Sequence, residues 1–197
     1  FRTYLGAASS LSADEISPAD FADADHAHLE GYLLFNRDLA LKILQCAKEA
    51  GCTVSLDLAS FEVVRANEDI LESLLTDYVD IVFANEEEAK AFTRSDNHEE
   101  NLNTFAQLCN TVAVKIGAEG AWLKHANEVV RVNALKADAI DTTGAGDLWA
   151  AGFLFEFLRG KSLADAGKLA SRLGAEVVQI LGADIPKTTW KTIKEPI

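Results

Sequence analysis

A glycine-rich segment in the last third of the chain has the residue types and spacing best suited to chemistry. It reads Asp141-Thr142-Thr143-Gly144-Ala145-Gly146-Asp147 and stands directly before the apolar run 148–158, for which we predict a helix. The first N–H groups of a helix have no partner within it and lie at the positive end of its dipole. This segment therefore predicts a cradle of N–H donors for an anion such as phosphate. The donors would belong to Gly144, Ala145, Gly146 and Asp147.

The two glycines also have a purely structural interpretation, because they permit a tight loop whether or not a ligand binds. Asp147 favours a chemical role. A carboxylate in the first helical turn pairs well with the helix dipole, and beside a phosphate it can accept the proton of an attacking hydroxyl. We expect the helix start to favour the charged form of Asp147, which makes it a weak base that is ionised at neutral pH.

The elements that must position this segment alternate between helix and strand. Each apolar helical stretch ends near a glycine or a polar turn and leads into a short β-branched strand, which is typical of βαβ units. The strands lack an alternation of polar and apolar residues, as in a parallel sheet covered on both faces. We predict an α/β fold with helices over 37–50, 68–76, 86–92, 101–108, 148–158 and 163–181, and strands over 2–7, 53–58, 80–84 and 111–116. The residues 120–124 and 128–132 predict a hairpin.

The 197 residues carry 18 Lys and Arg against 31 Asp and Glu, a formal charge of −13 that excludes a phosphate-backbone binder such as a nucleic-acid-binding protein. Hydrophobic residues make up 49%, which excludes general disorder, and no apolar run is long enough for a membrane span. The three cysteines, Cys46, Cys52 and Cys109, form no C-x-x-C pair, so we expect free thiols and a cytoplasmic protein. We expect His26 and His28 to face solvent in an acidic loop, and Trp122 and Trp149 to belong to the core.

The 141–147 segment, followed by Leu148, Ala150 and Gly152, resembles the C-terminal signature of the ribokinase-like (PfkB) carbohydrate and nucleoside kinases. The resemblance continues at Asn85 and Glu88, which are similar to the family's N-x-x-E motif. It includes the turn at 115–120 and the segment at 182–186, and it covers nearly the whole chain. Other nucleotide motifs are absent: Trp149 stands where G-x-G-x-x-G needs glycine or alanine, and no Walker loop occurs.

The resemblance implies a mostly parallel, Rossmann-like sheet with helices on both faces, and ATP-dependent phosphorylation of a hydroxyl group of a sugar or nucleoside. It implies that Asp147 accepts the hydroxyl proton while the Gly144–Asp147 N–H groups stabilise the moving phosphoryl group. It implies ATP contacts along two segments and Mg²⁺ held through its water shell by Asn85 and Glu88. The ATP contacts would be Lys115, Gly117, Glu119, Gly120 and Thr143. Asp141 would help to hold a monovalent cation such as K⁺.

Two alternatives remain open at this stage. Asn85 with Glu86, Glu87 and Glu88 has an ordinary interpretation as an N-cap followed by a solvated first helical turn. At the level of function, the chain could be a non-catalytic nucleotide or phosphate sensor, or an interaction module derived from a kinase. Asp147 argues against the sensor, since a sensor needs no proton acceptor and its charge would repel phosphate.

The chain is shorter than the family pattern. It has no methionine and begins at Phe1 inside an apparent strand, so we interpret residues 1–197 as one α/β domain of a longer protein, or as a sequence from which Met positions were dropped. Residues 1–8 would be the last strand of a small β lid that is otherwise absent, and in this family the lid would also form any homodimer. The segments 2–8 and 55–60, with Trp149, are most similar to bacterial sugar kinases of the adenosine-kinase-like branch.

Overall fold

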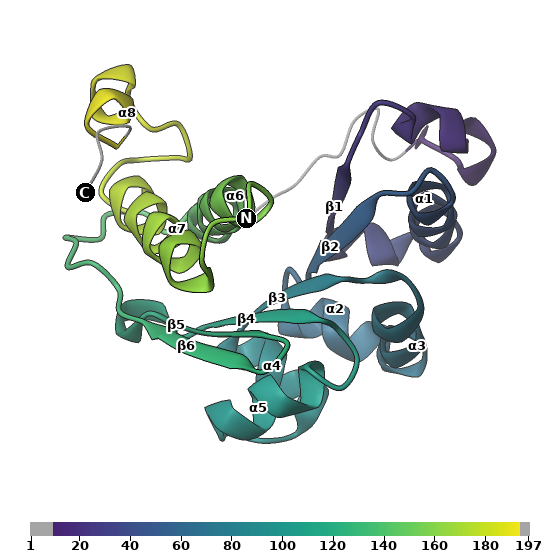
Figure 1. The fold of residues 1–197 in the computed structure, drawn as a ribbon, viewed down its shortest axis with the longest axis horizontal. Helices are drawn as coiled ribbons and strands as arrows, with labels where there is room; N and C mark the ends of the chain where they lie inside the picture. Colours follow the sequence, from purple (N-terminus) through teal and green to yellow (C-terminus); the bar gives the residue numbers. More distant parts are fainter. Residues whose placement is uncertain (1–9, 194–197) are drawn as a thin grey trace.

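The computed structural model describes residues 10–193 and places one six-stranded sheet at their centre (Figure 1). The strands pair in chain order, from β1 (His26–Glu30) through β2 (Thr53–Asp57) and β3 (Ile81–Asn85) to β4 (Thr111–Lys115), all parallel. β5 (Ala121–His125) and β6 (Glu128–Val132) continue the sheet as an antiparallel hairpin. The predicted α/β class and the mostly parallel sheet are confirmed.

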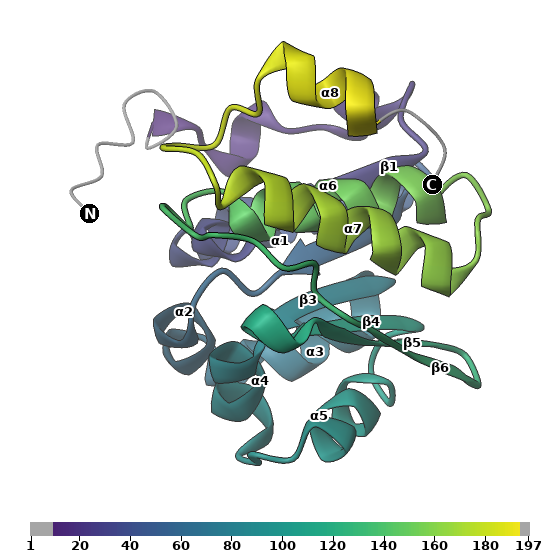
Figure 2. The same cartoon turned by 90° about the vertical axis from the view of Figure 1, so that its left-hand side faces the viewer.

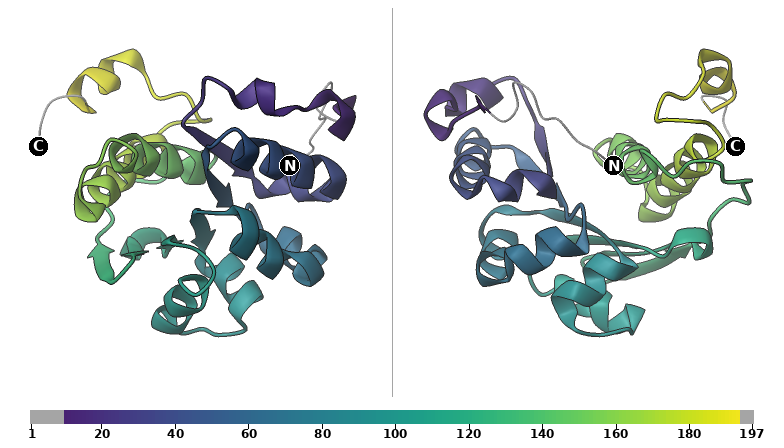
Figure 3. Two further views of the ribbon diagram at one scale, coloured as in Figure 1. Left: turned by 45° about the vertical axis from the view of Figure 1, so that its right-hand side comes forward. Right: turned by 180° about the vertical axis from the view of Figure 1, so that it is seen from behind.

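Helices cover both faces of the sheet, as Figures 1 and 3 show. Parallel strands in sequential order require crossovers of one hand, so the connecting helices share one face. These are α1 (Arg37–Glu49), α2 (Phe61–Ala66), α3 (Glu68–Tyr78), α4 (Glu86–Thr93) and α5 (His98–Phe105), and a single apolar cluster joins them to β1–β4. α6 (Ala145–Phe157) and α7 (Leu163–Val177) cover the other face, with α8 (Lys187–Ile193) beyond them (Figure 2).

α6 and α7 cover only part of their face. Their cluster contains Phe83 of β3 together with Ala113 and Leu123, but no residue of β1 or β2. On that side β1 and β2 carry polar side chains, which are those of His26, His28, Glu30, Thr53, Ser55 and Asp57. The consequence is a polar strip of sheet beside the start of α6.

Two expectations from the sequence were wrong. The histidines 26 and 28 lie in strand β1 rather than in a loop, because Ala27 and Leu29 alternate with them and bury against the α1 side. The run 148–158 is not central, since Phe155 and Leu158 are 51% and 45% exposed on the outer side of α6. The predicted strand at 2–7 lies outside the described residues, and within residues 10–193 no helix is long and apolar enough to cross a bilayer.

Candidate functional site

The segment before α6 folds as a tight turn whose key glycine is Gly144. This residue caps α6 with φ of 75°, and a Cβ there would lie 2.5 Å from Cβ of Ala183. Gly146 lies inside the first helical turn, where a Cβ would meet only Nζ of Lys115, at 3.5 Å. Gly144 is thus required by the turn, whereas Gly146 keeps space open beside Lys115.

The N–H groups of this turn are only partly available. The Ala145 N–H donates to the Thr142 carbonyl at 3.1 Å, so it is not a free donor as the sequence suggested. The N–H groups of Gly144, Gly146 and Asp147 donate to no acceptor within residues 10–193. These three N–H groups are the donors of the predicted anion cradle that are available to a ligand.

Asp141 fixes the turn from its other side. One carboxylate oxygen accepts the Thr143 N–H at 2.9 Å and the Thr143 hydroxyl at 2.7 Å, and the other accepts the Gly182 N–H at 2.9 Å. These hydrogen bonds, led by that from Gly182, lower the pKa of Asp141. Asp141 therefore connects the turn before α6 to the loop at Gly182. The Thr143 hydroxyl donates its hydrogen bond to Asp141.

One lysine and four carboxylates gather where the carboxyl ends of β1–β4 meet the starts of α4 and α6. Nζ of Lys115 lies 2.7 Å from Oδ2 of Asp57, and both side chains are largely buried. Glu30 is the register partner of Asp57 on the neighbouring strand. The charges of Glu30 and Asp57 act on both Glu88 and Asp147. The excess negative charge here would favour a hydrated cation.

Asn85 and Glu88 form a reciprocal capping box at the start of α4. The Asn85 N–H and side-chain amide donate to the two Glu88 oxygens at 2.7 and 2.6 Å, and Oδ1 of Asn85 accepts the Glu88 N–H at 2.9 Å. Glu88 is only 2% exposed, and its burial, followed by the charge of Asp57, raises its pKa to about 7. The N-cap interpretation of Asn85 is therefore correct, but Glu88 is a buried group and not part of a solvated turn.

The direction in which the pKa of Asp147 is shifted differs from the expectation. Partial burial and the charges of Glu30 and Asp57 raise the pKa of Asp147, while Lys115 lowers it less. The neighbouring carboxylates thus outweigh the helix dipole. Asp147 is a stronger base than its place at a helix start alone would make it.

The turn after β4 brings two glycines to the site, but not Glu119. Gly117 and Gly120 have φ of 53° and 102°, and a Cβ at Gly120 would overlap the Val132 carbonyl at 1.9 Å. Glu119 is paired with Arg131 at 3.6 Å on the exposed side of the turn. The turn therefore brings Gly117 and Gly120 to the site and points Glu119 away from it.

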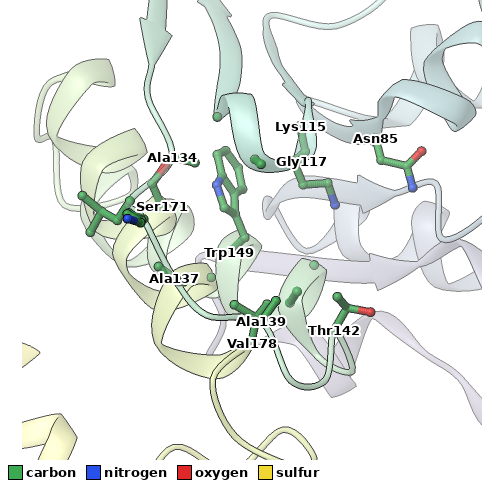
Figure 4. Close-up of a pocket in the computed structure, with 18 residues that line it drawn as sticks. Asn85, Lys115, Gly117, Ala134, Ala137, Ala139, Thr142, Trp149, Ser171 and Val178 are labelled. Atoms are coloured by element: carbon green, nitrogen blue, oxygen red, sulfur yellow. The ribbon is translucent and has the colours of Figure 1, made fainter.

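A pocket of about 640 Å³ joins these parts (Figure 4). One end is lined by Asn85, Lys115 and Gly146, and the other by the loop 134–139, the α7 residues Ser171 and Gly174, and Val178 just after α7. The Trp149 indole lies between Lys115 and Ser171. The Ser171 hydroxyl is buried and has no partner among the described residues.

The sequence did not identify Glu30, Asp57 or Ser171. Asp57 ends an apolar strand just as Asn85 does, and that position was a usable signal. Ser171 lies among the small residues of α7, and only the packing of α7 on α6 shows that it faces the pocket. Within residues 10–193 no three His, Cys, Asp or Glu side chains converge as metal ligands.

Comparisons with known proteins identify the family of the chain. Residues 1–190 match the family model described as pfkB family carbohydrate kinase. A probable sugar kinase from Rhizobium etli superposes with a TM-score of 0.87 and 33% identity over 94% of this chain and 58% of its own. Adenosine kinase from Sinorhizobium meliloti gives a TM-score of 0.84 and 30% identity over 92% of this chain and 58% of its own.

A curated relative, ATP-dependent ribose-1-phosphate kinase from Halopiger xanaduensis, is 32% identical over 86% of this chain and 54% of its own length. The chain thus spans less than two thirds of these relatives. The match to the family model extends over nearly the whole chain, and the fold agrees with it. The chain belongs to the pfkB family of carbohydrate kinases.

Proposed function

We propose that this chain carries the nucleotide-binding and catalytic part of a kinase that transfers the γ-phosphoryl group of ATP to a hydroxyl of a sugar or nucleoside. The observation that carries the proposal is the continuous pocket. It ends at Lys115 and at N–H groups of the α6 start that have no acceptor within residues 10–193, beside Asp147, whose pKa is raised. The names of the relatives, which include a sugar kinase, adenosine kinase and ribose-1-phosphate kinase, support the substrate class.

The donor nucleotide would lie along the pocket. Its phosphates would meet the N–H groups of Gly146 and Asp147 and the Lys115 ammonium, where fixed donors stabilise the charge on the transferring oxygens. The turn at Gly117 and Gly120 lets the backbone approach the nucleotide closely. Its base would lie at the α7 end, where the Ser171 hydroxyl has no partner within residues 10–193. Thr143 would act indirectly, because its hydroxyl is bound to Asp141.

Asp147 would take the proton of the attacking hydroxyl. As the acceptor oxygen bonds to the γ-phosphorus, the bond to the β–γ bridging oxygen breaks, ADP leaves, and the hydroxyl proton moves to the Asp147 carboxylate. The raised pKa of Asp147 makes this transfer more favourable than it is for an ordinary aspartate. The free N–H donors beside it hold the phosphoryl group in line.

Mg²⁺ fits the residues present, because the carboxylates of Glu30, Asp57, Glu88 and Asp147 outnumber the lysine in this cluster, Lys115, and Glu88 is buried. When bound with ATP, it would neutralise phosphate charge during transfer. Asn85 lines the pocket and would hold a metal-bound water. Glu88 accepts a hydrogen bond from the Asn85 side-chain amide and so fixes its orientation. A monovalent cation at Asp141 stays a prediction of the resemblance, because the three hydrogen bonds to this carboxylate leave part of its acceptor capacity open.

ADP release by the complete protein tests the proposal. With MgATP we expect release that depends on an added acceptor, with adenosine, ribose and fructose as the first probes. ATP binding without acceptor-dependent release would favour the sensor instead. Stable folding without any ATP binding would favour an interaction module.

A further inference from the structure

A second pocket, of about 400 Å³, lies between α2 and α4, which pack side by side (Figure 2). These helices cover the face of the sheet opposite α6 and α7. The residues that line the pocket are Phe61 and Arg65 on α2 and Glu87, Lys90, Ala91 and Arg94 along one stripe of α4 and its C-cap. None of them lines the pocket proposed for the nucleotide, so the α2–α4 pocket is a separate site.

Three of the six lining residues are positively charged, in a chain where Asp and Glu outnumber Lys and Arg by 31 to 18. Arg65 and Lys90 lie in the last turns of their helices and Arg94 caps α4, so the helix dipole favours each cation by itself. The dipole does not compensate for the repulsion between three like charges around one hollow. Negative charge must be supplied there.

Protein carboxylates supply part of this charge from outside the pocket. Nη2 of Arg94 lies 2.8 Å from Oε1 of Glu68, and Nζ of Lys90 lies 2.5 Å from Oδ1 of Asp96. All four side chains are exposed, and exposed ion pairs contribute little to stability. An anionic ligand can therefore replace either carboxylate at little cost in free energy.

Arg65 has neither an ion pair nor a hydrogen-bond acceptor for its guanidinium within residues 10–193. Its Cζ lies over the Phe61 ring, 5.1 Å from the ring centre. Such a stack uses the flat face of the guanidinium group and leaves the N–H donors at its edge free to bind an anion. Arg65 thus offers the pocket a fork of available donors.

The backbone of Arg94 is strained. It ends α4 with φ of 65°, in the left-handed region where helices commonly terminate on Gly, because a side chain is unfavourable there. The exposed pair with Glu68 is a weak compensation for this strain. Strained residues cluster at ligand sites, and the strain here places a guanidinium group at the edge of the pocket.

The lining indicates which anion would fit. Guanidinium and ammonium groups together suit the doubly charged oxygens of a phosphate monoester, which arginine binds through two N–H donors. A pocket of about 400 Å³ has room for more than the phosphate group. Phe61 and Ala91 add apolar surface, and the Glu87 carboxylate accepts a hydrogen bond from a hydroxyl but repels a second negative charge.

We propose that the α2–α4 pocket binds a phosphate monoester with a hydroxyl-bearing body, such as a sugar phosphate or a nucleoside monophosphate. Arg65, Lys90 and Arg94 bind the phosphate group. Glu87 accepts a hydrogen bond from a hydroxyl of the body, which lies against Phe61. This ligand class includes the product of the proposed reaction, and only in that respect does the inference rest on the proposed function.

Binding to the complete protein tests the site. Calorimetry should detect ribose 5-phosphate and AMP while a non-hydrolysable ATP analogue with Mg²⁺ occupies the nucleotide pocket. Arg65→Gln should weaken the binding of both esters by roughly 10-fold, the loss expected for a hydrogen bond between charged groups. Arg159→Gln is the matched control and should bind as wild type. Arg159 also stacks on a phenylalanine near a helix end, with Cζ 3.7 Å from the Phe155 ring centre, but it lies outside the pocket.

Two further variants separate binding from folding and from simple attraction of charge. Arg94→Gly should weaken binding by a similar factor without lowering Tm, because glycine adopts φ of 65° without strain. Inorganic phosphate should bind wild type roughly 5-fold more weakly than ribose 5-phosphate, since it lacks the body that contacts Glu87 and Phe61. Glu87→Ala should reduce this preference.

The absence of calorimetric binding by both esters would overturn the proposal. Binding that Arg65→Gln and Arg94→Gly leave unchanged would overturn it too, because the ester would then lie elsewhere, as would an equal loss in Arg159→Gln. Inorganic phosphate that binds as tightly as the esters would overturn the assigned ligand class. None of these measurements requires turnover, so failure of this site and failure of the proposed kinase activity are distinguishable.

Discussion

At the scale of single residues, Asp147 and Glu88 show how neighbours decide what a carboxylate does. Each lies in the first turn of a helix, where the dipole favours a negative charge. Each nevertheless has a raised pKa, because burial and the charges of nearby carboxylates outweigh that effect. The sequence placed both residues correctly at helix starts, but their charge environment comes from β1 and β2, which are far away along the chain.

Asp147→Asn should leave ATP binding nearly unchanged and lower kcat by roughly 10²- to 10⁴-fold, the range for a positioned acid or base. Asparagine keeps the shape of the side chain and tolerates a helix start, but it accepts no proton. Steady-state kinetics and a nucleotide titration of the complete protein measure the two effects. Asp165→Asn is the matched control, because Asp165 is also the third residue of its helix but lies in α7, outside the pocket. A similar fall in kcat for both variants would remove Asp147 from the proton-transfer step.

Glu88 should make the free energy of unfolding fall as pH rises. Its pKa is raised from 4.5 to about 7 in the folded protein, so the folded state holds a proton that the unfolded state releases. The stabilising effect is complete below about pH 4.5 and is lost as pH rises through about 7. Urea titrations without Mg²⁺ should show Glu88→Gln gaining on the order of 3 kcal/mol relative to wild type across this window. For Glu87→Gln, a change at an exposed position, the free energy of unfolding should vary with pH as it does in wild type. The same pH dependence in Glu88→Gln would show that Glu88 does not titrate in this window.

At the scale of elements, local periodicity predicted most helices and strands, because each carries its own apolar face or run. Strand β1 was missed since only Ala27 and Leu29 are apolar, and its other residues belong to the polar strip. Helix α2 was missed because it is only six residues long. The start of α6 was predicted well, since its turn depends on residues that lie next to one another in the sequence.

A side chain added at Gly146, at the start of α6, should block the phosphate site. Gly146→Val should reduce kcat by about 10²- to 10³-fold, the cost of one misplaced oxyanion donor, because the added side chain fills the gap beside Nζ of Lys115. Gly146 has no positive φ, so the fold should persist in circular dichroism. Ala151→Val places the same side chain on the exposed side of α6 and should be nearly wild type in rate. A Gly146→Val protein with normal kcat, or one whose lost activity matches lost folded protein, would contradict the cradle.

At the scale of the whole molecule, the sequence identified the phosphate end of the site but not its extent. Parallel strands bring Glu30, Asp57, Asn85 and Lys115 to one edge of the sheet, although 85 positions separate the first from the last. That convergence depends on strand order and register, which no local pattern contains. The same holds for Ser171, whose access to the pocket depends on how α7 lies against α6.

This architecture predicts that ATP stabilises the molecule as a unit. The pocket is lined by β3, the turn after β4, the loop at 134–142, α6 and α7, so a nucleotide would add contacts that connect all of these segments. A ligand at 100 times its Kd adds about 2.7 kcal/mol to the stability of the folded state. In thermal unfolding of the complete protein, saturating MgATP should therefore raise Tm by roughly 5 °C. Inorganic phosphate at equal ionic strength should raise it far less, because it reaches only the cradle. An ATP effect no larger than that of phosphate would mean that the α7 end of the pocket does not hold the base.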